Sequence, residues 1–181
     1  MKRFTMMIVI AMMTLGVYAQ QKATKSSTPI YAGGSLIFES TSDETAIAIV
    51  PEVGYKLSNK WGIGAKFGYG KEGSGDSKYT VFSFKPYLRQ NMYAIGQVGV
   101  FLDYHILYQN EGQKDNKTNT FGIGVAPGLS LNLNSRLSVV STIGFLGYTS
   151  SKLDVEGAEA VNKFILRARS EDIQLGIFYN F

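Results

Sequence analysis

The residues with the clearest catalytic potential in this chain are its single histidine and a nearby aspartate. His105 follows Asp103 by two positions, so in an extended strand both side chains lie on one face. A carboxylate can orient an imidazole, and an imidazole held in this way can activate a hydroxyl nucleophile. Many serines are present, and none stands out as that nucleophile. The interpretation that we prefer places His105 in a polar cluster inside the protein.

A second chemical motif is the glycine series Gly68, Gly70 and Gly73, which matches the spacing of a dinucleotide-binding loop. That motif needs a strand, a tight turn and then a helix, because the helix N-terminus binds the pyrophosphate. Here a polar loop follows, so we interpret these glycines as a strand that enters a loop. The chain has no Cys, which excludes disulfides, thiolate metal sites and a cysteine nucleophile. No cofactor or metal site is predicted.

Composition indicates a single folded domain with an unusually small charged fraction. The 181 residues are 45% hydrophobic and only 18% charged, whereas soluble domains average about 25% charged. The formal net charge is +4, and Lys2 and Arg3 contribute two of these charges. The remaining excess is too small to indicate a nucleic-acid partner.

The first residues have the pattern of a signal peptide. Lys2 and Arg3 precede an apolar run over residues 4–15, and Val17 and Ala19 place small residues before a cleavage site. The apolar run is shorter than the roughly 20 residues that a membrane-spanning helix needs. We predict a signal peptide over residues 1–19 with cleavage after Ala19, a polar lead-in over 20–29, and one domain over 30–181.

Apolar residues in that domain recur at every second position, which is the period of a β-strand. Eight stretches show this alternation, at residues 30–40, 46–57, 61–70, 79–89, 93–108, 120–133, 136–150 and 164–181. Tight turns are expected at 58–60, 90–92 and 134–135, and longer polar loops at 41–45, 71–78, 109–119 and 151–163. Pro51 and Pro127 each remove a hydrogen-bond donor from a strand, and we expect a local bulge at each or a wide tilt in the periplasmic half.

The two faces of these stretches differ in a way that identifies the outside of the fold. One face is bulky and aromatic, whereas the other carries Gly, Ala, Ser and a few charges. The narrow interior of eight strands accommodates only the second face, so the bulky face should meet lipid. We therefore predict an all-β fold, an eight-stranded antiparallel up-and-down transmembrane β-barrel. The alternative is a soluble lipocalin-like barrel, whose apolar face would point inwards. Aromatic residues expected at the membrane interfaces are Tyr55, Trp61, Tyr69, Tyr93 and Tyr108.

Three segments carry a resemblance to a known family: residues 51–55, residues 61–64 after a tight turn, and residues 176–181. With the signal peptide, they resemble the small outer-membrane protein β-barrel domain family, a porin-like group that includes OmpX-like proteins and the OmpA transmembrane domain. The resemblance implies the outer membrane of a Gram-negative bacterium. We also predict contact with lipid and lipopolysaccharide, and a monomer. The terminal pattern resembles the signal read by the barrel-assembly machinery, and its residues are Ile173, Leu175, Ile177, Tyr179 and Phe181.

The charged residues of the inward face should compensate one another inside the barrel. A hairpin centred on Asn59 would place Glu52 opposite Lys66, and one centred on Asn91 would place Lys85 opposite Gln97. The remaining polar residues of the same interior are Arg89, Asp103 and His105. An unpaired charge in a narrow lumen is costly, so these groups are expected to form one network that closes the lumen. The alternative is that some of these side chains lie in the wider, wet ends of the barrel and are solvated.

The most defensible function at this stage is structural: an integral envelope protein with surface loops and no wide pore. The family implies no single activity, because the same barrel supports adhesins, structural proteins and enzymes. The first alternative is an adhesin or ligand-binding protein that acts through its loops. The second is an outer-membrane enzyme that modifies lipid A with His105, which we do not favour because such an enzyme would present its catalytic histidine to the membrane.

Overall fold

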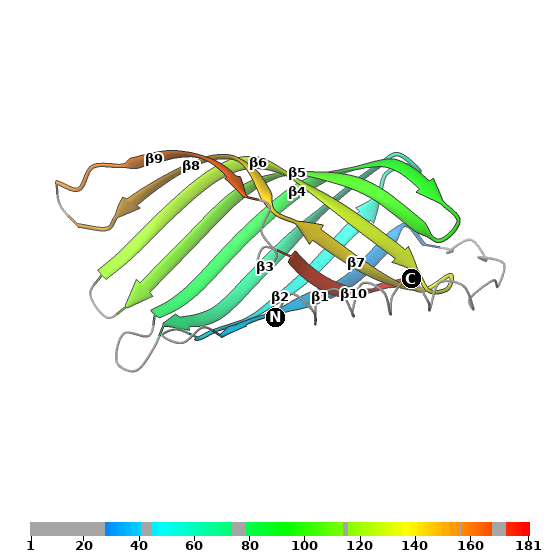
Figure 1. Cartoon of the computed structure of the whole chain (residues 1–181), viewed down its shortest axis with the longest axis horizontal. Coiled ribbons are helices and arrows are strands. Elements are labelled where there is room, and N and C mark those ends of the chain that lie inside the picture. Colours follow the sequence, from blue (N-terminus) through cyan, green and yellow to red (C-terminus); the bar gives the residue numbers. More distant parts are fainter. Residues whose placement is uncertain (1–27, 41–44, 74–78, 114–115, 156, 168–172) are drawn as a thin grey trace.

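The computed structural model describes residues 28–40, 45–73, 79–113, 116–155, 157–167 and 173–181 (Figure 1). The predicted signal peptide and most of the lead-in lie outside the described residues. Among the residues that are described, no helix is long and apolar enough to span a membrane.

The described part of the chain is built from ten strands. They are β1 (Ile30–Ser40), β2 (Thr45–Lys56), β3 (Trp61–Gly73), β4 (Tyr79–Ile95), β5 (Val98–Gln113), β6 (Asn116–Asn132), β7 (Leu137–Ile143), β8 (Phe145–Leu153), β9 (Val161–Arg167) and β10 (Ile173–Asn180). The first six overlap predicted stretches one to six, but β4 extends to Ile95, and β5 and β6 occupy most of the predicted loop at 109–119. The seventh predicted stretch is divided into β7 and β8, and the eighth into β9 and β10.

These strands close into one barrel with eight strand positions around its circumference, because two of the positions are each shared by two short strands (Figure 1). Strands β1 to β6 each pair with the next, β6 pairs with β7 and β8, β7 pairs with β10, and β10 pairs with β1. The β8–β9 hairpin completes the seventh and eighth strand positions: β8 continues the position of β7, and β9 continues that of β10. All pairs are antiparallel, so the predicted fold class is confirmed. We call the end with connections 57–60, 96–97 and 133–136 the turn end, and the opposite end the loop end.

The division between β7 and β8 is a bulge at Gly144. Gly128 of β6 pairs with Thr142, but Val125, three residues earlier, pairs with Leu146, four residues later. The seventh strand position, formed by β7 and β8, therefore contains one extra residue relative to β6. Gly144 has a φ of 68°, a left-handed conformation that glycine adopts without the steric cost of a side chain.

The turn predicted at residues 90–92 is wrong, because β4 continues to Ile95. The connection to β5 is made by Gly96 and Gln97, and Gly96 has a φ of 58°, which suits a two-residue hairpin turn. Asn91 has a turn-forming side chain, but that side chain donates a hydrogen bond to the Asn59 carbonyl oxygen at 3.0 Å. A bulge between Asn91 and Tyr93 follows, and the hairpin then extends beyond the end of β3.

Both strand prolines sit in interruptions of the ladder. The bulge predicted at Pro51 is wrong, whereas Pro127 lies opposite the bulge at Gly144, whose extra residue is on the partner strand. Pro51 lies between the pairs Ile49–Tyr69 and Glu52–Lys66, with equal numbers of residues on both strands. Pro127 lies between the β6–β7 and β6–β8 pairs, where the ladder is already interrupted. Each missing donor therefore falls where no ladder bond to that neighbour exists.

Bulky apolar side chains cover the outside of the barrel, as the alternation predicts. Ile47, Ile49 and Val53 on β2 are each about half exposed, at 57%, 53% and 48%. The same face continues around the wall through Ile63, Phe67, Phe82, Leu88, Ile106, Ile123, Leu146 and Ile177. Most inward positions between them are small, polar or charged, and a few hold buried aromatic residues such as Tyr31, Phe101 and Phe178. Large apolar side chains therefore predominate on the outside, which is the reverse of the soluble-barrel alternative.

Candidate functional site: a charged lumen network and an outer groove

Four charged residues from four successive strands meet in the lumen, and we call them the lumen network: Glu52, Lys66, Arg89 and Asp103. The register places Glu52 of β2 opposite Lys66 of β3, as the sequence predicts. It places Arg89 of β4 opposite Asp103 of β5. Because side chains alternate along each strand, all four point into the same interior.

Each cation of the lumen network contacts both anions. Arg89 donates from Nε to Asp103 Oδ1 at 2.7 Å and from Nη2 to Asp103 Oδ2 at 2.8 Å. Its Nη2 also lies 3.3 Å from Glu52 Oε1. Lys66 Nζ lies 3.3 Å from Asp103 Oδ2 and 3.8 Å from Glu52 Oε2. The four charges therefore form one connected cluster, and none forms an isolated pair.

Two tyrosines complete the hydrogen bonding of this cluster. The Tyr87 hydroxyl donates to Glu52 Oε1 at 2.5 Å, and the Tyr31 and Tyr87 hydroxyl oxygens are 2.7 Å apart. Neither tyrosine was predicted from the sequence as a residue of this site. Tyr87 could have been found, because it lies on the same face of its strand as Lys85 and Arg89.

Burial makes charge compensation necessary at this site. The exposed fraction of Asp103 is 1%, and those of Glu52, Lys66 and Arg89 are below 10%. A buried charge without a partner is strongly destabilising, whereas two cations with two anions leave no net charge. Such a cluster can close the lumen and fix the register of four strands.

An apolar layer lies against the lumen network on the turn-end side. The Arg89 guanidinium lies 4.0 Å from the Phe101 ring centroid, which is a cation–π contact. Phe101 is buried together with Tyr31, Val140 and Phe178. Beyond this layer a vestibule of about 590 Å³ is lined by residues of the turn end, including Lys56 and Asn180.

The remaining predicted lumen residues are Lys85, Gln97 and His105, and the ladder register places each of them. Lys85 faces the lumen and lies opposite Lys66, so its predicted pairing with Gln97 is wrong. Gln97 lies in the β4–β5 turn, because that turn is six residues later than predicted. His105 faces the lumen between Tyr87 and Gly124, and its ring centroid is 5.3 Å from that of Phe145.

The predicted interfacial aromatics lie on the outer face toward the strand ends. Tyr55, Trp61 and Tyr93 lie toward the turn end, whereas Tyr69 and Tyr108 lie toward the loop end. The predicted assembly residues Ile173, Leu175, Ile177, Tyr179 and Phe181 end the chain. Along β10, Leu175, Ile177 and Tyr179 are exposed, while the alternate residues are buried.

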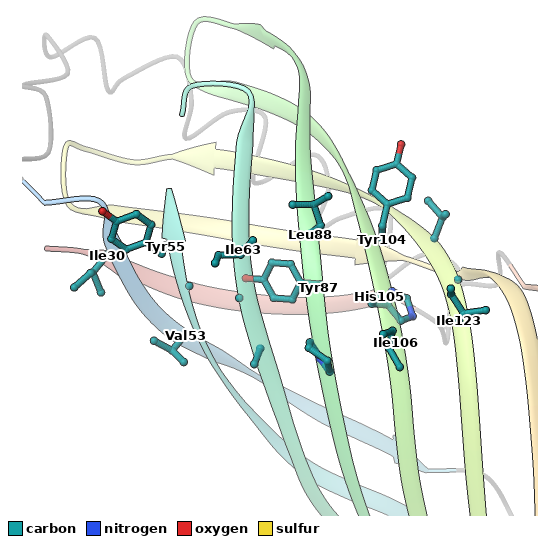
Figure 2. A pocket seen from close by; sticks show the side chains of 16 residues that line it. Ile30, Val53, Tyr55, Ile63, Tyr87, Leu88, Tyr104, His105, Ile106 and Ile123 are labelled. Carbon is teal, nitrogen blue, oxygen red and sulfur yellow. The ribbon is translucent and has the colours of Figure 1, made fainter. Parts of the chain in front are cut away.

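A groove of about 970 Å³ crosses the outer face of β1 to β6, and we call it the outer groove (Figure 2). On its turn-end side is a row formed by Ile30, Tyr55, Ile63, Leu88, Tyr104 and Val125. On its loop-end side is a row formed by Val53, Ala65, Pro86, Ile106 and Ile123. Ala65 lies opposite Pro86 in the ladder. Because these two side chains are small, the second row projects least from the barrel surface at its middle. The sequence analysis did not predict this groove.

Taken together, these features define the class: the chain has the fold of the small outer-membrane β-barrels, with a charged cluster inside the lumen. The crystal structure of Neisserial surface protein A (NspA) is similar, with a TM-score of 0.54 at 14% sequence identity over 84% of this chain and 96% of that chain. The N-terminal β-barrel domain of Pseudomonas aeruginosa OprF matches with a TM-score of 0.46 at 11% identity, over 85% of this chain and 98% of that one. No protein-family model and no curated protein matches the sequence.

Proposed function

We propose that this protein is an integral outer-membrane protein of a Gram-negative bacterium with a structural role in the envelope. The observation that carries this proposal is the reversed distribution of side chains. Bulky apolar residues are exposed all around the outside, while Glu52, Lys66, Arg89 and Asp103 are buried within. A protein surrounded by water would gain stability from the opposite arrangement.

The proposed orientation places the turn end in the periplasm and the loop end outside the cell, which is the usual arrangement of such barrels. Trp61 and Tyr55 would then lie at the periplasmic interface and Tyr69 at the external one. Contact with lipid and lipopolysaccharide follows from this placement. The alternation along β10 supports assembly by the barrel-assembly machinery, and the protein is proposed to be a monomer.

In this proposal the lumen network closes the barrel to the passage of ions. An ion crossing the lumen would have to separate Arg89 from Asp103 or displace Phe101 beneath them. Both are costly, because the cluster is buried and its charges are compensated. The interior of eight strands has room for side chains and little else.

The proposal assigns no catalytic role to His105. Its side chain faces the lumen, with the Phe145 ring at 5.3 Å, whereas an enzyme acting on lipid A would present its histidine to the membrane. The enzyme alternative would be supported if expression of the protein altered the mass of lipid A and His105→Ala abolished that change.

The proposal is tested by membrane fractionation and by a gel of boiled against unboiled sample. We expect the mature chain in the outer-membrane fraction, with a mobility that changes on boiling, because a closed barrel pairs its backbone groups internally and resists detergent. Recovery as a soluble protein with no mobility change would contradict the proposal.

A further inference from the structure

The turn end of the barrel has a charge distribution unlike the rest of the molecule. Its described residues, 28–35, 53–64, 88–102, 126–142 and 175–181, contain no Asp or Glu. They contain Lys56, Lys60, Arg89 and Arg136, and the charge of Arg89 is compensated inside the lumen. The charged side chains on the outer rim of this end are therefore all basic, which favours an anionic group placed there.

The outer groove begins at this basic rim. At one end it is lined by Ile30, the first residue of β1, and at the other end by Ile123 and Val125 in the middle of β6. Lys60 lies in the turn that joins the strands of Tyr55 and Ile63. On the other side of β1, Arg136 donates from Nη1 to the Tyr179 hydroxyl oxygen at 3.1 Å. Cations therefore lie on both sides of the beginning of the groove.

The length and slope of the groove fit one acyl chain. Six strands separated by about 4.8 Å give a length of roughly 24 Å across the wall. Strands in such barrels are tilted by about 45°, so a groove perpendicular to them rises by roughly 17 Å, which is close to half of the ~30 Å hydrocarbon core. The groove thus runs from the headgroup level of one leaflet to about the middle of the bilayer.

We propose that the outer groove and the cations Lys60 and Arg136 bind an anionic phospholipid of the periplasmic leaflet. The phosphate lies at the basic rim, and one acyl chain follows the groove across Ala65 and Pro86. Apolar lining provides contact for the chain, and each cation near an anionic headgroup strengthens binding. This inference rests on the proposed outer-membrane location and names a ligand class for its periplasmic side.

Trp61, the single tryptophan of the chain, provides the measurement because it is adjacent to Lys60. The mature protein is folded into phosphatidylcholine vesicles that contain a small fraction of brominated phosphatidylglycerol or brominated phosphatidylcholine. Quenching of Trp61 fluorescence by the two lipids gives their relative affinity at the groove. We expect a preference for phosphatidylglycerol of about five-fold for each cation engaged, the factor that corresponds to about 1 kcal/mol per basic residue.

Matched variants separate the two parts of the proposed site. Lys60→Gln with Arg136→Gln is expected to abolish the preference, and Ala65→Phe is expected to reduce it by filling the groove. Lys152→Gln at the loop end and Ser141→Phe on the outward face of β7 make equivalent changes elsewhere, and they should leave the preference unchanged.

Three results would overturn the inference. The first is equal quenching by the two lipids in the unaltered protein, and the second is a preference that Ala65→Phe leaves intact, which would mean headgroup binding alone. The third is displacement of phosphatidylglycerol by lipopolysaccharide, which would assign the groove to the other leaflet. A chain that fails to insert, with no mobility change on boiling, instead contradicts the proposed outer-membrane location.

Discussion

The substitution Asp103→Asn tests the central role of the lumen network. Asp103 accepts two hydrogen bonds from Arg89, at 2.7 and 2.8 Å, and one from Lys66 at 3.3 Å. Removing its charge leaves two cations with Glu52 alone, so the buried cluster acquires a net positive charge. Breaking a buried ion pair in this way typically costs about 3–5 kcal/mol, and we expect a loss of this size in the free energy of unfolding.

The measurement is urea unfolding of the barrel in lipid vesicles, followed by unboiled gel mobility and Trp61 fluorescence. The double variant Asp103→Asn with Lys66→Met restores neutrality and leaves Arg89 with Glu52. We therefore expect it to recover more than half of the loss, as a non-additive pair. Asp154→Asn, on the exposed connection after β8, is the control and should stay within about 0.5 kcal/mol of the unaltered protein.

Two results would refute this reasoning. A loss below about 1 kcal/mol for Asp103→Asn would mean that water solvates the cluster. Additive losses in the double variant would mean that Lys66 and Asp103 do not interact, although their charged atoms lie 3.3 Å apart.

Three further predictions concern the lumen and its packing. The charge swap Glu52→Lys with Lys66→Glu should not restore the stability measured by urea unfolding. The new lysine would face Arg89 on β4, and the new glutamate would face Asp103 on β5. Full restoration would show that Glu52 and Lys66 form an isolated pair. Gly64→Ala should destabilise the barrel by about 1–3 kcal/mol, because the added Cβ would lie 2.7 Å from the Val53 carbonyl oxygen, whereas Gly112→Ala meets nothing closer than 3.6 Å and should be nearly neutral in the same assay. Phe101→Ala should increase single-channel conductance in planar bilayers by removing the layer beneath Arg89, and an unchanged conductance would mean that the charged cluster alone closes the lumen.

Local pattern was sufficient to predict which residues face inwards. The two-residue period depends only on the extended backbone, so Glu52, Lys66, Arg89 and Asp103 were assigned to the interior before their partners were known. The pairing of Glu52 with Lys66 followed from the correct turn at 58–60.

The wrong turn at 90–92 shows what local pattern misses. A hairpin centred on Asn91 would pair Arg89 with Tyr93, whereas Arg89 pairs with Asp103, ten positions further along. Ten is an even number, so the inward face was still correct although every partner was wrong. Asn91 was misinterpreted because its side chain bonds to the Asn59 carbonyl oxygen on another hairpin, which no local window contains.

The sequence by itself therefore determined the strands, their inward and outward faces, and the class of barrel, because these depend on neighbours along one chain segment. Only the closed barrel decided which charges meet. Lys66 of β3 reaches Asp103 of β5, and Glu52 of β2 reaches Arg89 of β4, across strands that are not adjacent. The curvature of the wall brings these side chains together, and the same curvature places the two rows of the outer groove on a continuous surface.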